Sequence, residues 1–475
     1  MDEQIERELK FDVPEGWTLP DPAPVTPRGG SVRSQTIRMS STYFDTLEHD
    51  LLRSGITLRR RTGDTDTGWH LKVPAGDART EIRLPVGGES VPAEMLQLVR
   101  GIAGGATVRP IATLATQRNV HKLVGSEGND LAEIADDEVT ATVGGSALVI
   151  TKWHEVEVEL AGGDEKLLRR SAHWLARSGA TPASVGSKLA RAMGEDADRP
   201  QPGTLGALLY DYLHEQHRVM VRGDIELRRN ADVVHRTRVA TRRFRSVLRV
   251  FGSLFDEARA VALDAELAWY AERLGALRDV QVMRDHLRAQ VAALPADVRS
   301  DGLGVHIGEA LRVDEQEARG ELLAALSGDR YTALLREVRR FVEDEPTRVT
   351  MPKRDVEKFV RSALRTERRR LRSAGHEPVQ DDRMHRARKA AKRARYTAEV
   401  ARPVLGKTAR REVKRGKQLQ DELGELQDAI VASHYLLGLA NADGEIAFGL
   451  GVLWSIEQKR AAQARRTGRK RARSA

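Results

Sequence analysis

Charged and apolar side chains alternate with a period of two in several short stretches of the first 195 residues, and this pattern constrains the fold more than any other feature. Residues i and i+2 of a β-strand lie on one face, so each stretch predicts a strand with one charged and one apolar face. The charged sets are Glu6, Glu8 and Lys10; Arg59 and Arg61; His70 and Lys72; Arg79, Glu81 and Arg83; and Glu155, Glu157 and Glu159.

Two arrangements fit such strands, and the period alone does not separate them. One is a sandwich that is charged outside and apolar inside; the other is a closed barrel with a charged lumen and helices over its apolar outer face. Chemistry gives a reason for the barrel. Carboxylates bind hard divalent cations such as Mg²⁺ or Mn²⁺, while Arg and Lys hold phosphate oxygens, so a metal–phosphate site needs both charge types in one cavity.

The pattern becomes helical after residues 194–203, GEDADRPQPG, a polar segment rich in Pro and Gly. The runs 231–251 and 383–400 contain good helix formers and no Pro or Gly. We therefore expect a first domain at 1–195, a linker at 196–203, a helical domain at 204–458 and a basic tail at 459–475.

The helical half contains an internal repeat. VHRTRVATRRFRSVLRVF from Val234 aligns with MHRARKAAKRARYTAEVA from Met384, at an offset of 150 residues. LGALRDVQV from Leu274 aligns with LGELQDAIV from Leu423, at an offset of 149 residues. The repeats, at about 204–300 and 350–445, predict a duplicated helical unit with a pseudo-two-fold axis.

Positive charge is concentrated in the second half. Residues 1–195 contain 23 Lys/Arg and 28 Asp/Glu, whereas residues 196–475 contain 55 and 41. This asymmetry favours an anionic partner for the helical half. The last 17 residues hold eight Lys/Arg and no acid, which is typical of a disordered solvated tail, or else of an arm that binds a polyanion.

Each repeat carries a cationic stripe at helical spacing. The two sets are His235, Arg238, Arg242 and Arg245, and His385, Arg388, Lys392 and Arg395. Spacings of three and four residues place each set on one helix face. A single stripe is typical of a solvated face, but two equivalent stripes that both begin with His favour anion binding, with the histidines as pH-sensitive contributors.

Cysteine is absent, so any metal must be bound through oxygen or imidazole. The charged N-terminal segment is no secretory signal, and the longest apolar stretch, Ile446–Ile456, is shorter than the roughly 18 residues of a membrane span. We expect a cytoplasmic protein with no membrane partner, and a buried helix at Ile446–Ile456.

The first half resembles the CYTH family, the triphosphate tunnel metalloenzymes. ERELK at Glu6–Lys10 matches the ExExK signature of that family. Further matches follow in order: YFDT at 43–46, LRRR at 58–61, HLKVP at 70–74, Arg118, LAEIADDEV at 131–139, EVEVEL at 155–160, and SK at 187–188. The helical half resembles the CHAD domain, a helical module with conserved histidines and basic residues. Together these resemblances imply an α+β chain: an eight-stranded antiparallel β tunnel or barrel with flanking helices, then an all-α helical bundle with an internal two-fold repeat.

The CYTH resemblance implies hydrolysis of inorganic triphosphate with Mg²⁺ or Mn²⁺. It assigns Glu6, Glu8, Asp137, Glu157 and Glu159 as metal ligands and puts Glu155 at the tunnel mouth. Asp136 competes with Asp137, since one residue of register decides which of the two faces inward. Glu6, Glu8 and Lys10 form the catalytic set. The triphosphate-binding set is Lys10, Arg59, Arg61, Lys72, Arg83, Arg118 and Lys188.

The CHAD resemblance implies that the two His-led stripes bind long-chain polyphosphate, with possible association with polyphosphate granules. Three alternatives stay open: a hydrolase or cyclase acting on thiamine or nucleoside triphosphate, a non-catalytic polyphosphate scaffold, and nucleic-acid binding by the basic half. The last is disfavoured because the basic half lacks interleaved aromatic residues and a known reading motif.

Overall fold

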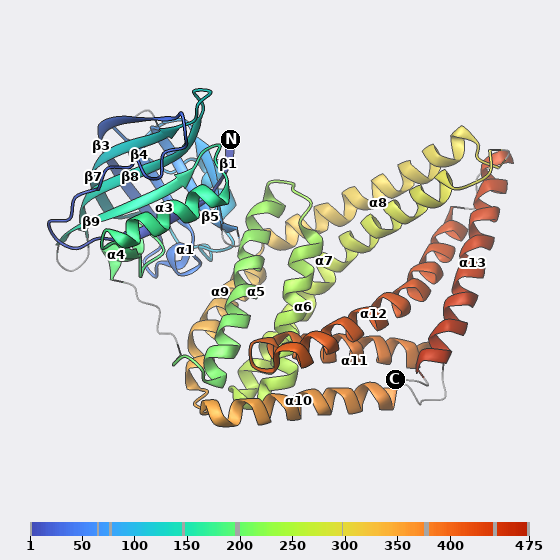
Figure 1. Cartoon of the computed structure of the whole chain (residues 1–475). Helices are drawn as coiled ribbons and strands as arrows, with labels where there is room; N and C mark the ends of the chain where they lie inside the picture. Colours follow the sequence, from blue (N-terminus) through green and yellow to red (C-terminus); the bar gives the residue numbers. More distant parts are fainter. Residues whose placement is uncertain are drawn as a thin grey trace. The chain divides into compact units, whose positions relative to one another are not determined.

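The computed structural model of the chain describes residues 2–63, 66–75, 78–144, 148–194, 200–296, 298–374, 380–439 and 444–472. The chain divides into two compact units, Met1–Ala197 and Asp198–Ala475. The first is built around one antiparallel sheet and the second is helical (Figure 1), so the predicted α+β class is confirmed. No described helix has the length and apolar character that crossing a membrane requires.

The sheet of the first unit closes on itself. Its strands are β1 (Asp2–Glu6), β2 (Glu8–Asp12), β3 (Ser31–Asp45), β4 (Thr57–Thr62), β5 (Gly68–Ala75), β6 (Ala78–Leu84), β7 (Arg109–Val124), β8 (Asp130–Val143), β9 (Val149–Leu160) and β10 (Thr181–Pro182), in the order β1-β6-β5-β4-β3-β7-β8-β9-β2-β10. Arg7 alone separates β1 from β2, and these strands pair with β6 and β9 at opposite ends of the order. The N-terminal strand therefore joins both edges.

This arrangement is the closed barrel rather than the sandwich. Within the described residues the assignment gives ten strands instead of the predicted eight, because the N-terminal strand is interrupted at Arg7 and the two-residue β10 pairs with β2. The apolar outer face is covered: Phe11, Val156 and Val158 pack against Leu167 and Leu175 of α3 (Glu165–Arg177). The alternate residues of the same strands face inward.

Short helices brace the sheet: α1 (Asp50–Arg53), α2 (Ala93–Val99) and α4 (Lys188–Met193), together with α3. Asp45, in the YFDT segment, links α1 to the sheet. Its buried carboxylate accepts hydrogen bonds from the backbone N–H groups of Thr46, Leu51 and Leu52 at 2.7, 2.9 and 2.9 Å. These bonds satisfy N–H groups of α1 that have no partner within the helix, which fixes the turn between β3 and β4.

The second unit consists of helices α5 (Leu205–Arg228), α6 (Val234–Phe251), η1 (Gly252–Leu254), α7 (Glu257–Ala292), α8 (Asp301–Ser327), α9 (Asp329–Asp344), η2 (Pro346–Arg348), α10 (Lys353–Ala374), α11 (Gln380–Val400), α12 (Arg402–Gly438) and α13 (Gly444–Ala472). Successive helices pack as α5–α6–α7–α8 and again as α10–α11–α12–α13. In Figure 1 α7 lies beside α8, and α12 beside α13.

The sequence offset places α6 with α11, α7 with α12 and α8 with α13, and each of these equivalent pairs is in contact. The repeating unit is longer than the sequence alignment predicts, because α8 and α13 extend it to Ser327 and Ala472. The expectation of a disordered tail at 459–475 is wrong for its described part, since α13 continues to Ala472. The expected burial of Ile446–Ile456 is also only partial: Leu453 is buried, but Phe448 is 62% exposed.

Candidate active site

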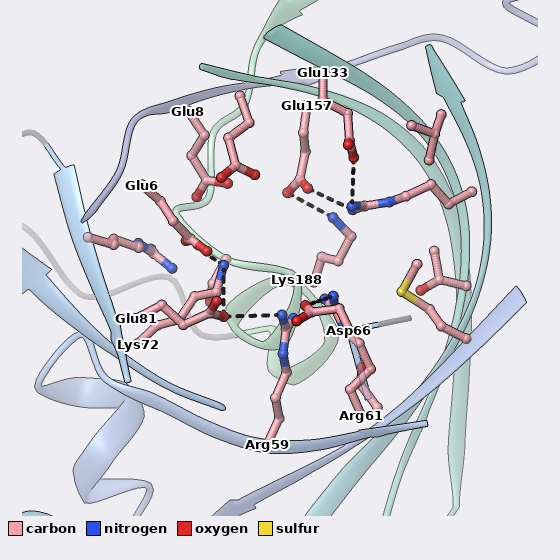
Figure 2. A pocket seen from close by; sticks show the side chains of 18 of the residues that line it. Glu6, Glu8, Arg59, Arg61, Asp66, Lys72, Glu81, Glu133, Glu157 and Lys188 are labelled. Atoms are coloured by element: carbon pink, nitrogen blue, oxygen red, sulfur yellow. Dashed lines mark hydrogen bonds and ion pairs between the residues drawn. The ribbon is translucent and has the colours of Figure 1, made fainter. Parts of the chain in front are cut away.

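The inward-facing side chains of the closed sheet line a cavity of about 320 Å³ (Figure 2). Glu6, Glu8 and Lys10 of the N-terminal strand all line it. The alternation continues through the break at Arg7, whose guanidinium lies on the outside, 3.1 Å from the carboxylate of Glu165. The predicted charged faces are therefore the lumen of the sheet.

Four of the five acids predicted to bind metal line the cavity: Glu6, Glu8, Glu157 and Glu159. Glu8 lies directly opposite Glu159 in the β2–β9 register, so two carboxylates of like charge stand side by side. Glu8 forms an ion pair with Lys10 at 3.3 Å, whereas Glu159 has no hydrogen bond or ion pair with any described residue. The nearby cations do not fully compensate the negative charge of this corner of the cavity.

The fifth acid, Asp137, lies behind the cavity wall instead of lining it. Its fully buried carboxylate accepts two hydrogen bonds from Arg118 at 2.7 Å each and lies 2.9 Å from the ammonium of Lys188. The neighbouring Asp136 is bound 2.5 Å from His154 Nε2. The register therefore directs Asp137 toward the site, where it positions two cations.

All seven cations of the predicted triphosphate set line the cavity: Lys10, Arg59, Arg61, Lys72, Arg83, Arg118 and Lys188. Lys72 lies 2.6 Å from Glu6, and Arg118 lies 2.9 Å from Glu157. Lys188, at the start of α4, lies 2.8 Å from Glu157 and 2.6 Å from Glu155. Glu155 is bound in this way beside the cavity rather than on its lining.

The charges set the protonation states of the site. Burial opposes ionisation of Glu157, but Lys10, Lys188 and Arg118 hold its pKa well below its usual range. Burial also opposes the charged form of Lys10, yet Glu157 and Glu8 raise the pKa of its ammonium. For Glu159, burial and then the nearby charge of Glu6 raise the pKa to about 7. Lys10 is therefore held protonated and cannot serve as a base.

The opposite side of the cavity is rich in cations. Burial, followed by repulsion from Arg59 and Arg118, lowers the pKa of Arg61 to about 10. Figure 2 shows Arg59 and Arg61 across the cavity from Glu6 and Glu8. A bound polyanion would relieve repulsion on the arginine side, and a divalent cation would relieve it among the acids.

The donor set fits a hard divalent metal. Glu6, Glu8 and Glu159 offer carboxylate oxygens in one corner, which suits Mg²⁺ or Mn²⁺, and the uncompensated Glu159 leaves room for a cation's charge. In proteins such an ion commonly takes phosphate oxygens as additional ligands. These three residues, with Glu157 beside them, are the ones that could hold it.

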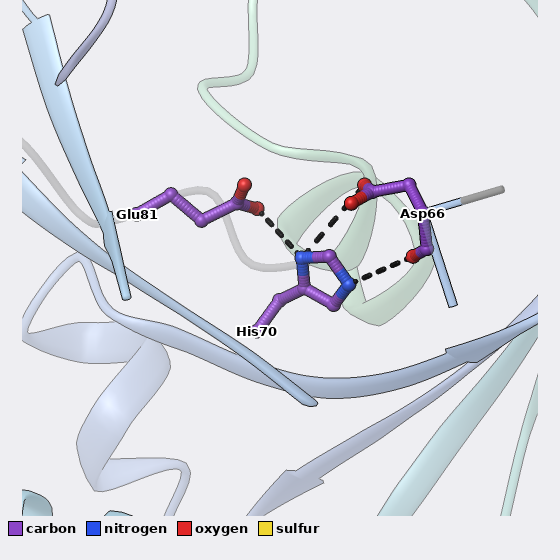
Figure 3. A group of neighbouring side chains, drawn as sticks. All are labelled: Asp66, His70 and Glu81. Carbon is purple, nitrogen blue, oxygen red and sulfur yellow. Dashed lines mark hydrogen bonds and ion pairs between the residues drawn. The ribbon is translucent and has the colours of Figure 1, made fainter. Parts of the chain in front are cut away.

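Asp66, His70 and Glu81 form a second group whose ligand atoms lie within 4.8 Å of one another (Figure 3). His70 Nδ1 is 3.1 Å from Glu81, and its Nε2 is 3.0 Å from the backbone oxygen of Asp66. The group could hold a metal ion, but Glu81 already contacts Arg59 at 3.6 Å, Lys72 at 3.5 Å, and Arg83. Its carboxylate charge is thus compensated, unlike that of Glu159.

The sequence reasoning gave no role to several residues that line this site, among them Glu81, Tyr43 and Asp66. Glu81 stands at period two between Arg79 and Arg83, so its inward position was readable from the pattern, although it was not assigned a role. Tyr43, whose hydroxyl lies 3.3 Å from Arg59, adjoins the recognised YFDT segment. Asp66 lies between β4 and β5, where no periodic signal exists, and it lies 2.9 Å from Arg61.

The second unit brings together part of the two predicted stripes. Arg238 and Arg242 of α6 lie near Arg388 and Lys392 of α11, the equivalent helix. Burial, and then repulsion from Arg388, Arg242 and Arg238, lowers the pKa of Lys392 to about 7. The buried Nε atoms of Arg238, Arg242 and Arg388 have no hydrogen-bond partner among the described residues. We name these four residues the shared cationic cluster.

A glycine of each repeat lies beside this cluster. A Cβ at Gly275 would lie 3.3 Å from Nη2 of Arg238, which is tight, so the absence of a side chain at Gly275 gives this guanidinium room. A Cβ at the equivalent Gly424 would lie 3.9 Å from Nη2 of Arg388, which is an ordinary contact.

Two of the remaining stripe residues are engaged in ion pairs of their own. Arg245 is bound to Asp264 at 2.9 Å, and Arg395 to Glu399 at 3.0 Å. His235 lies beside the cluster, where burial and then Arg278 lower its pKa, so it is neutral near pH 7. The side chain of His385 lies outside the described residues.

Comparisons with known proteins agree with the two-unit architecture. A model of the CYTH domain family matches residues 4–192, and a model of the CHAD domain family matches residues 211–437. The uncharacterized protein Rv2226 of Mycobacterium tuberculosis is 34% identical over 484 residues, covering 95% of this chain and 93% of that protein.

Two solved structures resemble part of the chain. PptA from Streptomyces chartreusis is 21% identical, covers 57% of this chain and 100% of its own, and has a TM-score of 0.47. The CHAD domain from the plant Ricinus communis is 23% identical, covers 59% of this chain and 94% of its own, and has a TM-score of 0.47.

The adjacent pair Asp136 and Asp137 provides a matched test of the geometry. We expect Asp137→Ala to lower the free energy of unfolding by about 3–5 kcal/mol, because it removes the fully buried acid that pairs with both Arg118 and Lys188 and leaves their charges less compensated. Asp136→Ala should cost at most about 1 kcal/mol, since it removes a contact with His154 alone. Urea unfolding followed by tryptophan fluorescence would measure both, and equal losses would contradict the assignment.

Proposed function

The chain belongs to the CYTH family through its first unit and to the CHAD family through its second, and from this premise we propose that it hydrolyses inorganic triphosphate. CYTH proteins act on triphosphate substrates and depend on a divalent metal. The observation that carries the proposal is the division of one cavity into an acidic corner and a cationic side. A triphosphate with its metal would neutralise both.

The residues act through charge and position. Arg59, Arg61 and Arg118 are suited to bind phosphate oxygens, Arg through paired N–H groups, while Lys72, Lys188 and Lys10 supply point charges. Hydrolysis joins a water oxygen to the terminal phosphorus and breaks its anhydride bond, releasing phosphate and pyrophosphate. The reaction spreads negative charge over the transferred phosphoryl group, which the surrounding cations stabilise.

Lys10 has a defined role in this scheme. Its ammonium contacts Glu8 and Glu157, and its raised pKa keeps it protonated, so it donates hydrogen bonds to phosphate rather than accepting a proton from water. Glu6, Glu8, Glu157 and Glu159, with Asp137 behind them, are the proposed metal set. A bound Mg²⁺ or Mn²⁺ would supply charge neutralisation and a water of lowered pKa.

We further propose that the second unit binds long-chain polyphosphate at the shared cationic cluster. Four cations from two equivalent helices face one another with too few acids to compensate them, and a flexible chain with about one charge per phosphate suits such a surface. Held in this way, the protein would associate with polyphosphate granules in the cytoplasm.

One observation favours a second candidate. Ile37, Met39, Leu114 and Val120 form an apolar part of the cavity lining, which would accommodate the organic group of thiamine or nucleoside triphosphate. Hydrolysis or cyclisation of such a substrate would use the same charged residues. Rates measured side by side on tripolyphosphate, thiamine triphosphate and ATP would separate the candidates.

The first prediction concerns the tunnel. Phosphate release from tripolyphosphate should require Mg²⁺ or Mn²⁺ and should fall by at least about a hundredfold in Glu6→Gln/Glu8→Gln, because two carboxylate ligands lose their charge. Glu94→Gln/Glu127→Gln, which alters two exposed acids, should retain full activity. Release that persists in the first variant would exclude the assigned site. No release from wild type, with polyphosphate still bound, would favour a scaffold.

The second prediction concerns polyphosphate. Arg238→Gln/Arg388→Gln should raise the Kd for long-chain polyphosphate by about tenfold or more and flatten its salt dependence, because two phosphate contacts are lost. Arg245→Gln/Arg395→Gln removes the same charge from the same helices at ion-paired positions and should have a smaller effect. Fluorescence anisotropy across a salt series would measure both. Tighter binding of duplex DNA at equal phosphate concentration would refute the polyphosphate assignment.

The third prediction concerns the uptake of protons when polyphosphate binds. Burial lowers the pKa of Lys392 to about 7, together with repulsion from Arg388 of its own helix and from Arg242 and Arg238 of α6, while Asp279 of α7 acts in the opposite direction. A bound polyanion raises that pKa, so binding should take up close to one proton at pH 8. Calorimetry in buffers of different ionisation enthalpy measures this uptake. Lys392→Met should abolish it; uptake unchanged in that variant would contradict the prediction.

A further inference from the structure

A groove lies on the outside of the first unit, between α3 and the segment that joins β2 to β3. It has a volume of about 730 Å³ and is lined by Pro24, Val25, Lys166, Arg169, Arg170, His173, Trp174 and Arg177. The inner face of α3 packs against Val156 and Val158 of β9, while Glu157, between them, faces the tunnel. The sheet therefore separates this groove from the tunnel.

The groove is cationic, and no acid lines it within the described part of the chain. Lys166, Arg169 and Arg177 are exposed and make no hydrogen bond or ion pair with any described residue. The helix dipole favours Arg177, which lies in the last turn of α3, but it opposes Lys166, which lies in the first turn. Like charges three or four residues apart also repel one another, so helix stability does not account for the whole set. Their position on one wall of a concave surface is what an anionic ligand requires.

The groove is also structured. Arg170 Nη2 donates a hydrogen bond of 2.9 Å to the backbone oxygen of Val25, which ties the β2–β3 segment to α3. Val25 is buried, and its backbone N–H bonds to the oxygen of Pro22 at 3.0 Å, so the opposite wall is held by its own turn. Two walls fixed to each other distinguish this site from a solvated helix face.

Apolar rings lie among the cations. Trp174 is half-buried: part of it packs against the core under α3 and part lines the groove, opposite the exposed Pro24. An inorganic phosphate chain cannot stack on an indole ring, whereas an aromatic base can. A nucleotide has both a base and phosphates, and the volume suits a ligand of that size.

We propose that this groove binds a nucleotide, with its base against Trp174 and Pro24 and its phosphates on Lys166, Arg169 and Arg177. The site is separate from the tunnel and independent of the reaction proposed there. His173, next to Trp174 in the lining, adds a donor that can also contact phosphate.

The test uses the full chain carrying Arg59→Gln/Lys72→Gln, so that the tunnel contributes little to nucleotide binding, and fluorescent mant-ADP as the probe. Adding Arg169→Gln/Arg177→Gln, both exposed positions, should raise the Kd of mant-ADP by about tenfold. Arg100→Gln/Arg109→Gln removes the same charge from exposed positions elsewhere on the unit and should leave the Kd unchanged. Thermal melting establishes that each variant is folded.

Trp174→Leu supplies the second arm: in the tunnel variant it should weaken mant-ADP binding by a similar factor, and in the chain with an intact tunnel it should leave the binding of tripolyphosphate unchanged. Three results would overturn the proposal: no saturable binding of mant-ADP in the tunnel variant, equal weakening by both arginine pairs, or displacement of mant-ADP by tripolyphosphate at the same concentration as by ADP. The last would make the groove a general anion site.

Discussion

Compensation between buried charges is the constraint on which the first unit depends. A sheet that closes around ionised side chains must offset the loss of their hydration, and the structure does this by pairing acids with bases on neighbouring strands. Lys72 with Glu6, Arg118 with Asp137, and Lys188 with three acids are the main examples. Compensation is incomplete at Glu159 and among the arginines, and these two deficits define where a metal and a phosphate chain would bind.

Much of this site could be predicted from the sequence, because strand period alone assigns charged residues to one face. Glu6, Glu8, Lys10 and two glutamates of β9, Glu157 and Glu159, line the cavity as their alternation indicates. Closure of the sheet was not readable in that way, since a sandwich has the same period, and it required the family resemblance. Asp66 was unreadable because it lies in a turn, where neighbours in space are set by the path of the chain.

The helical unit shows the same limit. Spacing of three and four residues placed each stripe on one face of its helix, yet it did not reveal that α6 packs against α11 or that their cations converge. Nor did it separate Arg238 from Arg245, because Asp264, the ion-pair partner of Arg245, lies on the next helix, α7, and is brought near by packing. The partner of Arg395, Glu399, lies four residues later on the same helix and was readable from the spacing.

The N-terminal strand, which pairs with both edges of the sheet, affects how the first unit folds. Residues 2–12 are synthesised before their partners, because β2 pairs with β9, which ends at Leu160, and β1 pairs with β6. The pairing of this strand is thus completed late, and part of its edge stays unpaired while most of the unit is synthesised. Such long-range pairing slows folding and exposes a strand edge to other chains. The charges of Glu3, Glu6 and Glu8 on this strand would help it avoid self-association during that interval.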